Sequence, residues 1–385
     1  MAISFYDCVA LAEKRALSKA VAISFILTRG QNPVAISCPL RIFMSMLNKA
    51  IIDLNAIRQN ALSVKKLLPQ KTKLCAVVKA DAYGHGAEKV ANALYPIADC
   101  FAVALVEEAV ALRLSGIDKE ILVLNRPMGT TDADTIARYD LTATVYKVSD
   151  VIMLNEAAKK EDTAVRVHVK INTGMNRQGV DDSEKLKSLL KTMDKCGRVA
   201  ISGVYTHYAC PENDSTRKKA TDKFLLANNL VKGYNNNVIA HASASGGMLK
   251  GEYFDMVRIG ILLYGYKPFE TDRISVIPAM RVYAPVIEER TIRKGESALY
   301  GVKPAEKPAN LTLIRYGYAD GLPRNEIDGI YNNRCMDVSA YTGVARGTKF
   351  INVLSDADRL AEGCGTISYE ILTKAAVRAE KIYID

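Results

Sequence analysis

Short apolar runs alternate with segments of helical periodicity along residues 49–267 of the chain. The first helical segment, NAIRQNALSVKKLL, repeats apolar side chains three or four residues apart at Ile57, Ala61, Val64 and Leu68, as one face of a helix requires. The apolar runs are AIIDL, LCAVVK, CFAVAL, EILVL, TATVY, AVRVHVKI, VAISGVY, NVIAHA and FDMVRIG. They lack polar alternation, which is typical of parallel strands buried on both faces. The pattern predicts an α/β fold with a (β/α)8 barrel of the TIM type.

A doubly wound parallel sheet is the alternative interpretation of the same pattern. Dinucleotide-binding sheets of that kind carry a GxGxxG turn at the start of the first helix, and this chain has no such turn there. The barrel is therefore the favoured interpretation.

The pattern changes in residues 268–385. Segments such as MRVYAPVIEERTI, NLTLIRYG and KFINVL are separated by Gly, Pro and Asn, and only DADRLAEGC has a clear helical pattern. This part predicts a mostly β C-terminal domain.

Residues 1–48 stand apart as an extension, with five basic residues against two acidic ones around the short apolar run AVAISFILT. They are interpreted as a weak targeting peptide, a disordered or loosely packed extension, or the product of an upstream start codon. We favour the last interpretation, with Met44 or Met46 as the true start, because a recognisable fold begins only near Lys49.

Composition narrows the class of protein. The net charge is +10, but basic and acidic residues are interleaved and no basic run contains aromatics, so a nucleic-acid partner is not indicated. No apolar run approaches the roughly 18 residues that cross a bilayer. The eight cysteines include no CxxC pair, which indicates reduced, mostly buried thiols of a cytoplasmic protein rather than a zinc or other metal site.

Lys79 is the first candidate for chemistry, because it ends the run CAVVK just before ADAYGHG. Catalytic side chains of a TIM barrel project from the carboxyl ends of its strands. A lysine desolvated there has a lowered pKa and can form a Schiff base with an aldehyde cofactor. The alternative is a lysine that extends from a strand end into solvent.

Several uncommon sequence motifs favour the catalytic interpretation of Lys79: CAVVKADAYGHG, VKINTGMNRQG, THYA, HASAS, FDMVRIGILLYG, YGYADGLPR, CMD and GTISYEI. In this fixed order, over about residues 49–385, the chain resembles the alanine racemases, fold-type III enzymes that use pyridoxal 5′-phosphate. The resemblance implies an isomerase that interconverts L-alanine and D-alanine by a two-base mechanism. It implies that the D-alanine produced is used for peptidoglycan. It also implies a homodimer with shared active sites.

The resemblance also assigns cofactor contacts. Lys79 would hold the cofactor covalently, Arg258 would face its pyridine nitrogen, and His207 would orient Arg258. The phosphate contacts would be Tyr83, Ser245, Gly260, Ile261 and Tyr369. Ser245 follows the seventh predicted barrel strand and Gly260 the eighth, where barrels commonly bind phosphate.

For the reaction itself, the resemblance implies Lys79 and Tyr300 as the two bases, with Tyr300 reaching the site from the partner subunit. Arg177 would polarise Tyr300 and the phenolic oxygen of the cofactor, and a carbamylated Lys170 would hold Arg177 in place. The partner's own copies of two further residues, Met336 and Asp337, would lie beside the substrate carboxylate. Tyr318 and Arg324 would line the substrate entrance.

Three positions depart from the family pattern: Ala244 replaces an asparagine, Asn172 an aspartate, and Asn333 an arginine of the entrance. Asn333 leaves gating and substrate breadth open. A serine or broad-specificity racemase is the second enzyme interpretation, although the ring of Tyr369 favours a methyl side chain. Two other classes with a similar barrel are alternatives. Amino-acid decarboxylases carry glycine-rich and cysteine-containing motifs that are not found in this sequence. A pyridoxal-phosphate carrier protein has the barrel without a second domain.

Overall fold

The computed structural model describes residues 22–27, 34–39, 46–300, 304–324 and 334–385. They form two compact units. The first is Leu54–Ala279, and the second joins the described residues up to Asp53 to Met280–Asp385.

The first unit is a barrel of eight parallel strands in the order β11-β4-β5-β6-β7-β8-β9-β10. The edge strands meet through backbone hydrogen bonds from Asp255 to Ala240 (3.0 Å) and from Arg258 to Ser243 (2.9 Å). The strands are β4 (Lys73–Val77), β5 (Cys100–Val103), β6 (Ile121–Val123), β7 (Thr142–Val145), β8 (Val165–Lys170), β9 (Val199–Tyr205), β10 (Ile239–His241) and β11 (Met256–Ile259). The predicted TIM-type barrel is thus confirmed, and each of these strands matches one predicted apolar run.

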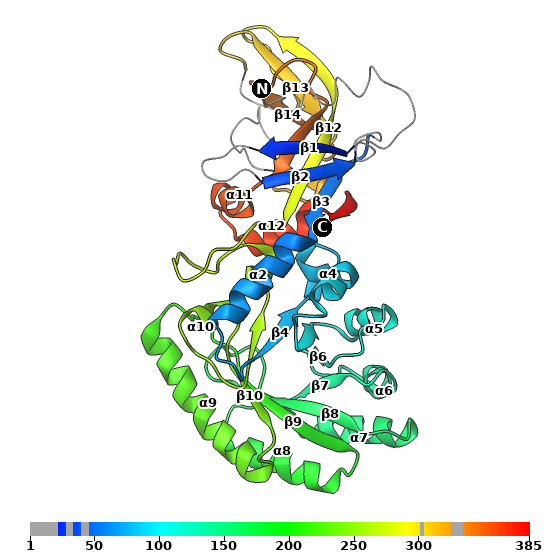
Figure 1. Cartoon of the computed structure of the whole chain (residues 1–385), viewed down its shortest axis with the longest axis vertical. Coiled ribbons are helices and arrows are strands. Elements are labelled where there is room, and N and C mark those ends of the chain that lie inside the picture. Colours follow the sequence, from blue (N-terminus) through cyan, green and yellow to red (C-terminus); the bar gives the residue numbers. More distant parts are fainter. Residues whose placement is uncertain (1–21, 28–33, 40–45, 301–303, 325–333) are drawn as a thin grey trace. The chain divides into compact units, whose positions relative to one another are not determined.

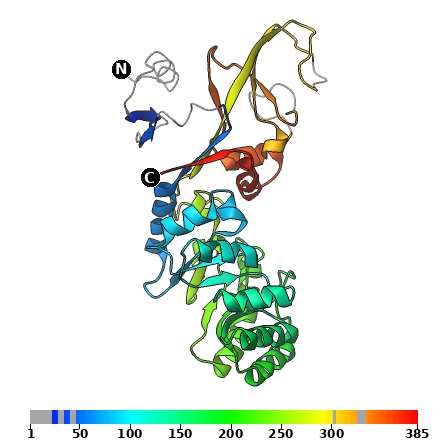
Figure 2. The same cartoon turned by 90° about the vertical axis from the view of Figure 1, so that its right-hand side faces the viewer.

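Helices follow the strands and lie outside them (Figures 1 and 2). They are α2 (Leu54–Leu67), α3 (Lys79–Tyr83), α4 (Ala87–Leu94), α5 (Val106–Leu114), α6 (Thr130–Arg138), α7 (Val148–Lys160), α8 (Ser183–Lys195), α9 (Asp214–Tyr234), α10 (Ser245–Leu249) and the 3-10 helix η2 (Ile261–Tyr264). Each long helix buries one apolar stripe. In α8, for example, Leu186, Leu189, Leu190 and Met193 are buried, while Asp182 caps the first turn by accepting from the Lys185 amide.

The second unit is built on a sheet in the order β14-β13-β12-β3-β16, with β15 also paired to β12. Its elements are β3 (Lys49–Asp53), β12 (Met280–Ile292), β13 (Ala309–Ile314), the 3-10 helix η3 (Tyr318–Asp320), β14 (Ser339–Thr342), β15 (Phe350–Leu354), α11 (Ala357–Cys364), α12 (Ser368–Ala375) and β16 (Glu380–Ile384). The mostly β character is confirmed. The pattern predicted α11 but not α12.

One apolar run lies in a different sheet from its neighbours. AIIDL forms β3, which pairs with β12 and β16 of the second unit instead of with a barrel strand. Consequently the units divide at residues 53/54 and 279/280, whereas the sequence places their boundaries near residues 48/49 and 267/268. The sequence pattern cannot distinguish these sheets, because a buried strand is apolar in either of them.

Within the extension, β1 (Ala22–Leu27) and β2 (Val34–Pro39) pair antiparallel. Met44 lies outside the described residues. Among the described helices, none combines the length and apolarity that a membrane span needs. Six cysteines are free: Cys75, Cys100 and Cys196, which are buried, and Cys210, Cys335 and Cys364.

A left-handed turn follows Lys79. Ala80, Asp81, Ala82 and Tyr83 have φ values of 51°, 53°, 53° and 54°, where each side chain costs about 1–2 kcal/mol of steric strain. The turn is held at both ends. The Glu108 carboxylate accepts from the Ala80 amide at 2.6 Å, and the Asp81 carboxylate accepts from the Ala87 amide at 2.8 Å. Such strain persists only where surrounding contacts over-determine the backbone, as at functional sites.

Ala80→Gly should stabilise the protein. Ala80 is exposed and its Cβ only adds strain, so its removal should raise the free energy of unfolding by about 0.5–1 kcal/mol after the extra unfolded-state entropy of glycine. Scanning calorimetry or urea unfolding measures this change. The control is Ala93→Gly, within α4, which should lower stability by about 1 kcal/mol. Equal losses in the two variants would contradict the strain argument.

Candidate active site

The predicted residues of the barrel lie at or just beyond the carboxyl ends of its strands. Lys79 lies two residues beyond β4, and Lys170 is the last residue of β8. His207 follows β9, Ser245 follows β10, and Gly260 follows β11. The strands therefore bring these residues, distant in sequence, to one end of the barrel.

The electrostatics of this end are dominated by positive charge. Burial lowers the pKa of Lys79, and the charges of Arg177 and Arg258 lower it further against the opposing effect of Glu108. Burial and Arg177 lower the pKa of Lys170 to about 7. This group of two lysines and two arginines, with Glu108 beside it, favours an anionic ligand, and the lowered pKa values favour loss of a proton from the two lysine amines.

His207 belongs to the same field. Burial and the charge of Arg258 lower its pKa to about 3, so the imidazole is neutral at physiological pH. A neutral histidine in this position can accept or donate a hydrogen bond without adding to the positive charge.

Arg258 is buried in the barrel, and both terminal nitrogens of its guanidinium are hydrogen bonded. It donates to the carbonyl oxygens of Thr206 (2.7 Å), Ala242 (3.1 Å) and His241 (3.2 Å). It also contacts His241 Nδ1 at 2.7 Å and His207 Nδ1 at 3.4 Å. Its shorter imidazole contact is therefore with His241, not with His207, which the resemblance assigns to it.

His241 is a site residue that the sequence interpretation missed. It is fully buried at the end of β10, and its ring stacks on Tyr205 at 4.8 Å between centroids. The signal was a histidine inside the apolar run NVIAHA, because a buried polar side chain requires a hydrogen-bond partner.

Lys170 donates to Gln178 Oε1 at 2.9 Å, and Gln178 donates in turn to Asn125 Oδ1 at 3.2 Å. The Lys170 ammonium also lies 5.5 Å from the centre of the Tyr205 ring. Gln178 directly follows Arg177 in the chain, and sequence reasoning assigned it no role. It is the observed partner of the lysine predicted to carry a carbamate.

Two of the predicted phosphate contacts of the barrel, Gly260 and Tyr83, lie against each other. A Cβ on Gly260 would lie 2.6 Å from the Tyr83 hydroxyl oxygen, so only glycine permits the observed approach of the two residues. The Tyr83 ring packs on Tyr264 at 4.8 Å. Ser245 and Ile261 are buried beside the ends of their strands.

The other predicted residues belong to the second unit. Tyr300, Met336 and Tyr318 are exposed by 78%, 55% and 41%, and Arg324 is exposed. The remaining two are Asp337, which pairs with Arg378 at 2.7 Å, and Tyr369, which lies half-buried in α12. Asn333 falls outside the described residues.

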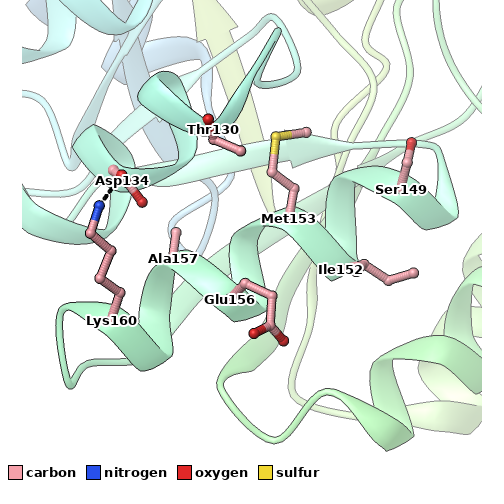
Figure 3. A pocket seen from close by; sticks show the side chains of 8 residues that line it. All are labelled: Thr130, Asp134, Ser149, Ile152, Met153, Glu156, Ala157 and Lys160. Carbon is pink, nitrogen blue, oxygen red and sulfur yellow. Dashed lines mark hydrogen bonds and ion pairs between the residues drawn. The ribbon is translucent and has the colours of Figure 1, made fainter.

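A surface hollow of about 560 Å³ lies elsewhere, between α6 and α7 (Figure 3). Lys160 and Asp134 pair at its side at 2.5 Å. None of the predicted site residues lines it. Among the described residues, no group of three or more His, Cys, Asp or Glu side chains is placed to hold a metal ion.

The residues at the barrel end fit a phosphorylated aldehyde. A desolvated amine can bond an aldehyde covalently, and the excess positive charge complements a phosphate and a carboxylate. Tyr83 and Ser245 carry hydroxyl groups, and Ser245 and Gly260 follow the seventh and eighth strands, where barrels bind phosphate.

Comparisons with known proteins point in one direction. The family described as "Alanine racemase, N-terminal domain" matches residues 52–268. The alanine racemase of Streptococcus pyogenes serotype M12 is 32% identical over 361 residues, which cover 87% of this chain and 97% of that protein. Alanine racemase 1 of Bacillus subtilis is 33% identical, over 87% of this chain and 92% of its own length.

Solved structures agree. The crystal structure of alanine racemase from Bacillus anthracis with bound L-Ala-P superposes with a TM-score of 0.82 at 28% identity, covering 89% of this chain and 96% of that one. The alanine racemase of Clostridium difficile 630 gives a TM-score of 0.83 at 28% identity and the same coverage.

Lys170→Met should stabilise the protein at neutral pH and have little effect at high pH. The folded protein holds the Lys170 pKa near 7 instead of its ordinary 10.5, so the unfolded state binds more protons between these values. Wild-type stability therefore rises with pH across this window. Urea unfolding in buffers free of carbon dioxide measures the difference. The control Lys191→Met, at an exposed position of α8, should show no such pH dependence; an identical profile for both variants would refute the assignment.

Proposed function

The chain belongs to the alanine racemase family, and on this premise we propose that it interconverts L-alanine and D-alanine with pyridoxal 5′-phosphate held on Lys79. The observation that carries the proposal is the desolvated amine of Lys79 at the carboxyl end of a barrel strand, near Lys170 and the charges of Arg177 and Arg258. As an alanine racemase, the protein is an isomerase.

Pyridoxal phosphate, when bound, withdraws electrons from the substrate's α-carbon and so acidifies the α-proton. Lys79 would hold it covalently, and Tyr83, Ser245, Gly260, Ile261 and Tyr369 would bind its phosphate. Arg258 would face the pyridine nitrogen. Because an arginine donates hydrogen bonds and stays protonated, it gives that nitrogen no proton. This restraint limits electron withdrawal, which suits a reaction that must return the proton to the same carbon.

Racemisation removes a proton from one face of the α-carbon and delivers one to the opposite face. The Lys79 amine, with its lowered pKa, would serve one face. Tyr300 would serve the other, with Arg177 stabilising the phenolate by its charge. No proton is consumed overall.

Tyr300 is 78% exposed, which fits a base that acts outside its own subunit. We propose a homodimer in which Tyr300, Met336 and Asp337 of each copy complete the site of the other. Large apolar side chains such as Met336 lie exposed in the single chain, and an interface would remove them from water.

Lys170 is proposed to carry a carbamate. Carbon dioxide adds to a neutral amine, and a pKa of about 7 makes much of Lys170 neutral at physiological pH. The resulting anion would be attracted to Arg177 and Arg258 and would replace the present contact with Gln178. Intact-peptide mass spectrometry of gently handled protein should show a carbamate-sized increase on Lys170, and an unmodified ammonium in a crystal structure of the active enzyme would refute it.

Alanine is the proposed substrate rather than serine, because the rings of Tyr300, Tyr318 and Tyr369 would leave little room beyond a methyl group. Discrimination by one small group is commonly about 1–3 kcal/mol, so slow turnover of serine is expected. The product would supply peptidoglycan synthesis in the cytoplasm. Chiral chromatography with L-alanine and L-serine offered separately compares the two substrates.

Lys79→Ala should abolish racemisation in both directions and the visible absorbance of the cofactor-loaded protein. The reason is that the covalent attachment and one of the two bases are lost together. Absorbance spectra and chiral chromatography measure the two effects. Lys185→Ala, on the exposed face of α8, is the matched lysine control and should change neither.

Tyr300→Phe should keep the cofactor absorbance and lose racemisation, while the α-proton of one enantiomer still exchanges with deuterated water through Lys79. Mixing this variant with Lys79→Ala tests the shared site. Random reassociation would leave one intact site in each mixed dimer, restoring about a quarter of wild-type activity. Two inactive variants that stay inactive after verified subunit exchange would exclude the proposed sharing. Tyr139→Phe is the tyrosine control.

A further inference from the structure

A chain of polar side chains crosses the inside of the barrel. Arg258 Nη1 contacts His241 Nδ1 at 2.7 Å, His241 Nε2 contacts His168 Nδ1 at 2.9 Å, and His168 Nε2 lies 3.4 Å from Glu120 Oε1. The two imidazoles are fully buried. The chain thus links the buried guanidinium at the proposed site to a carboxylate.

The four residues come from four different parts of the barrel. Arg258 lies on β11, His241 ends β10, His168 lies within β8, and Glu120 directly precedes β6. Glu120 therefore stands at the amino ends of the strands, opposite the end that carries Lys79. Its carboxylate is 30% exposed, so the chain runs from the proposed site to the solvent on the far side.

The barrel backbone makes room for this chain. A Cβ on Gly203 of β9 would lie 2.6 Å from ring atoms of His168, so a side chain there would displace the imidazole. The register of β8 against β9 also shifts between Val167 and His168, which breaks the regular alternation of the strand. The position of the His168 ring thus depends on two local features of the fold.

The contacts fix where each proton lies. Arg258 has only N–H donors, so His241 Nδ1 must accept and carries no proton. Burial and Arg258 lower the pKa of His241 well below its ordinary value, so this neutral ring keeps its proton on Nε2. That proton points at His168 Nδ1, which must therefore accept, and His168 carries its own proton on Nε2, toward Glu120.

Glu120 is suited to end such a chain. Burial alone would raise the pKa of Glu120, but the His168 imidazole at 3.4 Å, Thr142 and the charge of Arg166 outweigh burial and lower it. The carboxylate is ionised at physiological pH and can only accept. Every donor along the chain consequently points the same way, from Arg258 to Glu120.

We propose that Glu120 is a positioning residue for Arg258, acting through the proton positions of His168 and His241. The ionised carboxylate holds His168 in the Nε2–H form, which presents Nδ1 to His241, and His241 then presents Nδ1 to the guanidinium. The orientation of Arg258 toward a bound cofactor is in this way set from the opposite end of the barrel. The consequence for catalysis rests on the proposed function, whereas the proton arrangement does not.

The arrangement is measurable because the chain contains only four histidines. Protein labelled with ¹⁵N in histidine gives four imidazole spin systems, and long-range ¹H–¹⁵N spectra distinguish protonated from unprotonated ring nitrogens. In the wild-type protein, with and without added pyridoxal phosphate, His168 and His241 should both be neutral and protonated on Nε2. A proton on Nδ1 of either ring, or a doubly protonated His168, would overturn the proposal.

Variants at position 120 test transmission. Glu120→Leu removes the carboxylate that faces His168 Nε2 at 3.4 Å, so the Nε2 proton should exchange with solvent about tenfold faster, the factor that loss of a polar contact with a charged group commonly carries. The His241 signals should change as well, although His241 does not touch Glu120. Glu120→Gln keeps an acceptor oxygen and should restore both rings. A change confined to His168, or no change at either ring, would show that Glu120 does not act on Arg258.

A second measurement reads the effect at Arg258. In Glu120→Leu the guanidinium should be less well held. During turnover of alanine, the cofactor-loaded variant should therefore lose its visible absorbance about tenfold faster per racemisation event than the wild-type enzyme. Glu120→Gln should restore the wild-type rate. Glu107→Gln, on the exposed start of α5, is the carboxylate control. If the histidine signals are as predicted but the protein does not racemise alanine, the proposed function is wrong and the proton arrangement stands.

Discussion

The buried charge of Arg258 is the constraint on which the rest of the site depends. An ion inside a protein is tolerated only when hydrogen bonds replace its water, and here three backbone carbonyls and two imidazoles do so. Those carbonyls come from Thr206, His241 and Ala242, at the ends of β9 and β10. The guanidinium therefore binds the carboxyl ends of neighbouring strands together at the place where the chemistry is proposed.

The same charge sets the chemistry of its neighbours. Together with burial, which contributes most, it lowers the pKa values of Lys79, Lys170 and His207. Arg177 acts in the same direction from a more exposed position. An acidic residue in the centre of the group would reverse this effect, and Glu108 instead uses its carboxylate on the backbone amides of Ala80, Ala104 and Leu105.

The sequence predicted those parts of the molecule that depend on local pattern. Unbroken apolar runs identified the barrel strands, and the rule that catalytic groups follow strand ends located Lys79. The assignment of β3 to the second sheet depends on pairing with β12 and β16, strands more than 200 residues away, and no local pattern encodes it. The left-handed turn after Lys79 was equally hidden, because alanine and aspartate rarely adopt positive φ. The contact between His168 and His241 requires the register of three strands.

The architecture of the barrel also bears on the proposal that a second base comes from outside it. All its strand ends face one way, so the side chains they carry approach a ligand from beneath and from the rim. Lys79 and Arg258 both belong to this set. The proposed removal and return of a proton on opposite faces of one carbon uses a second group on the face away from the strand ends. Tyr300, exposed in the second unit, is the group proposed for that face, and the proposed pairing of two chains is how it would reach it.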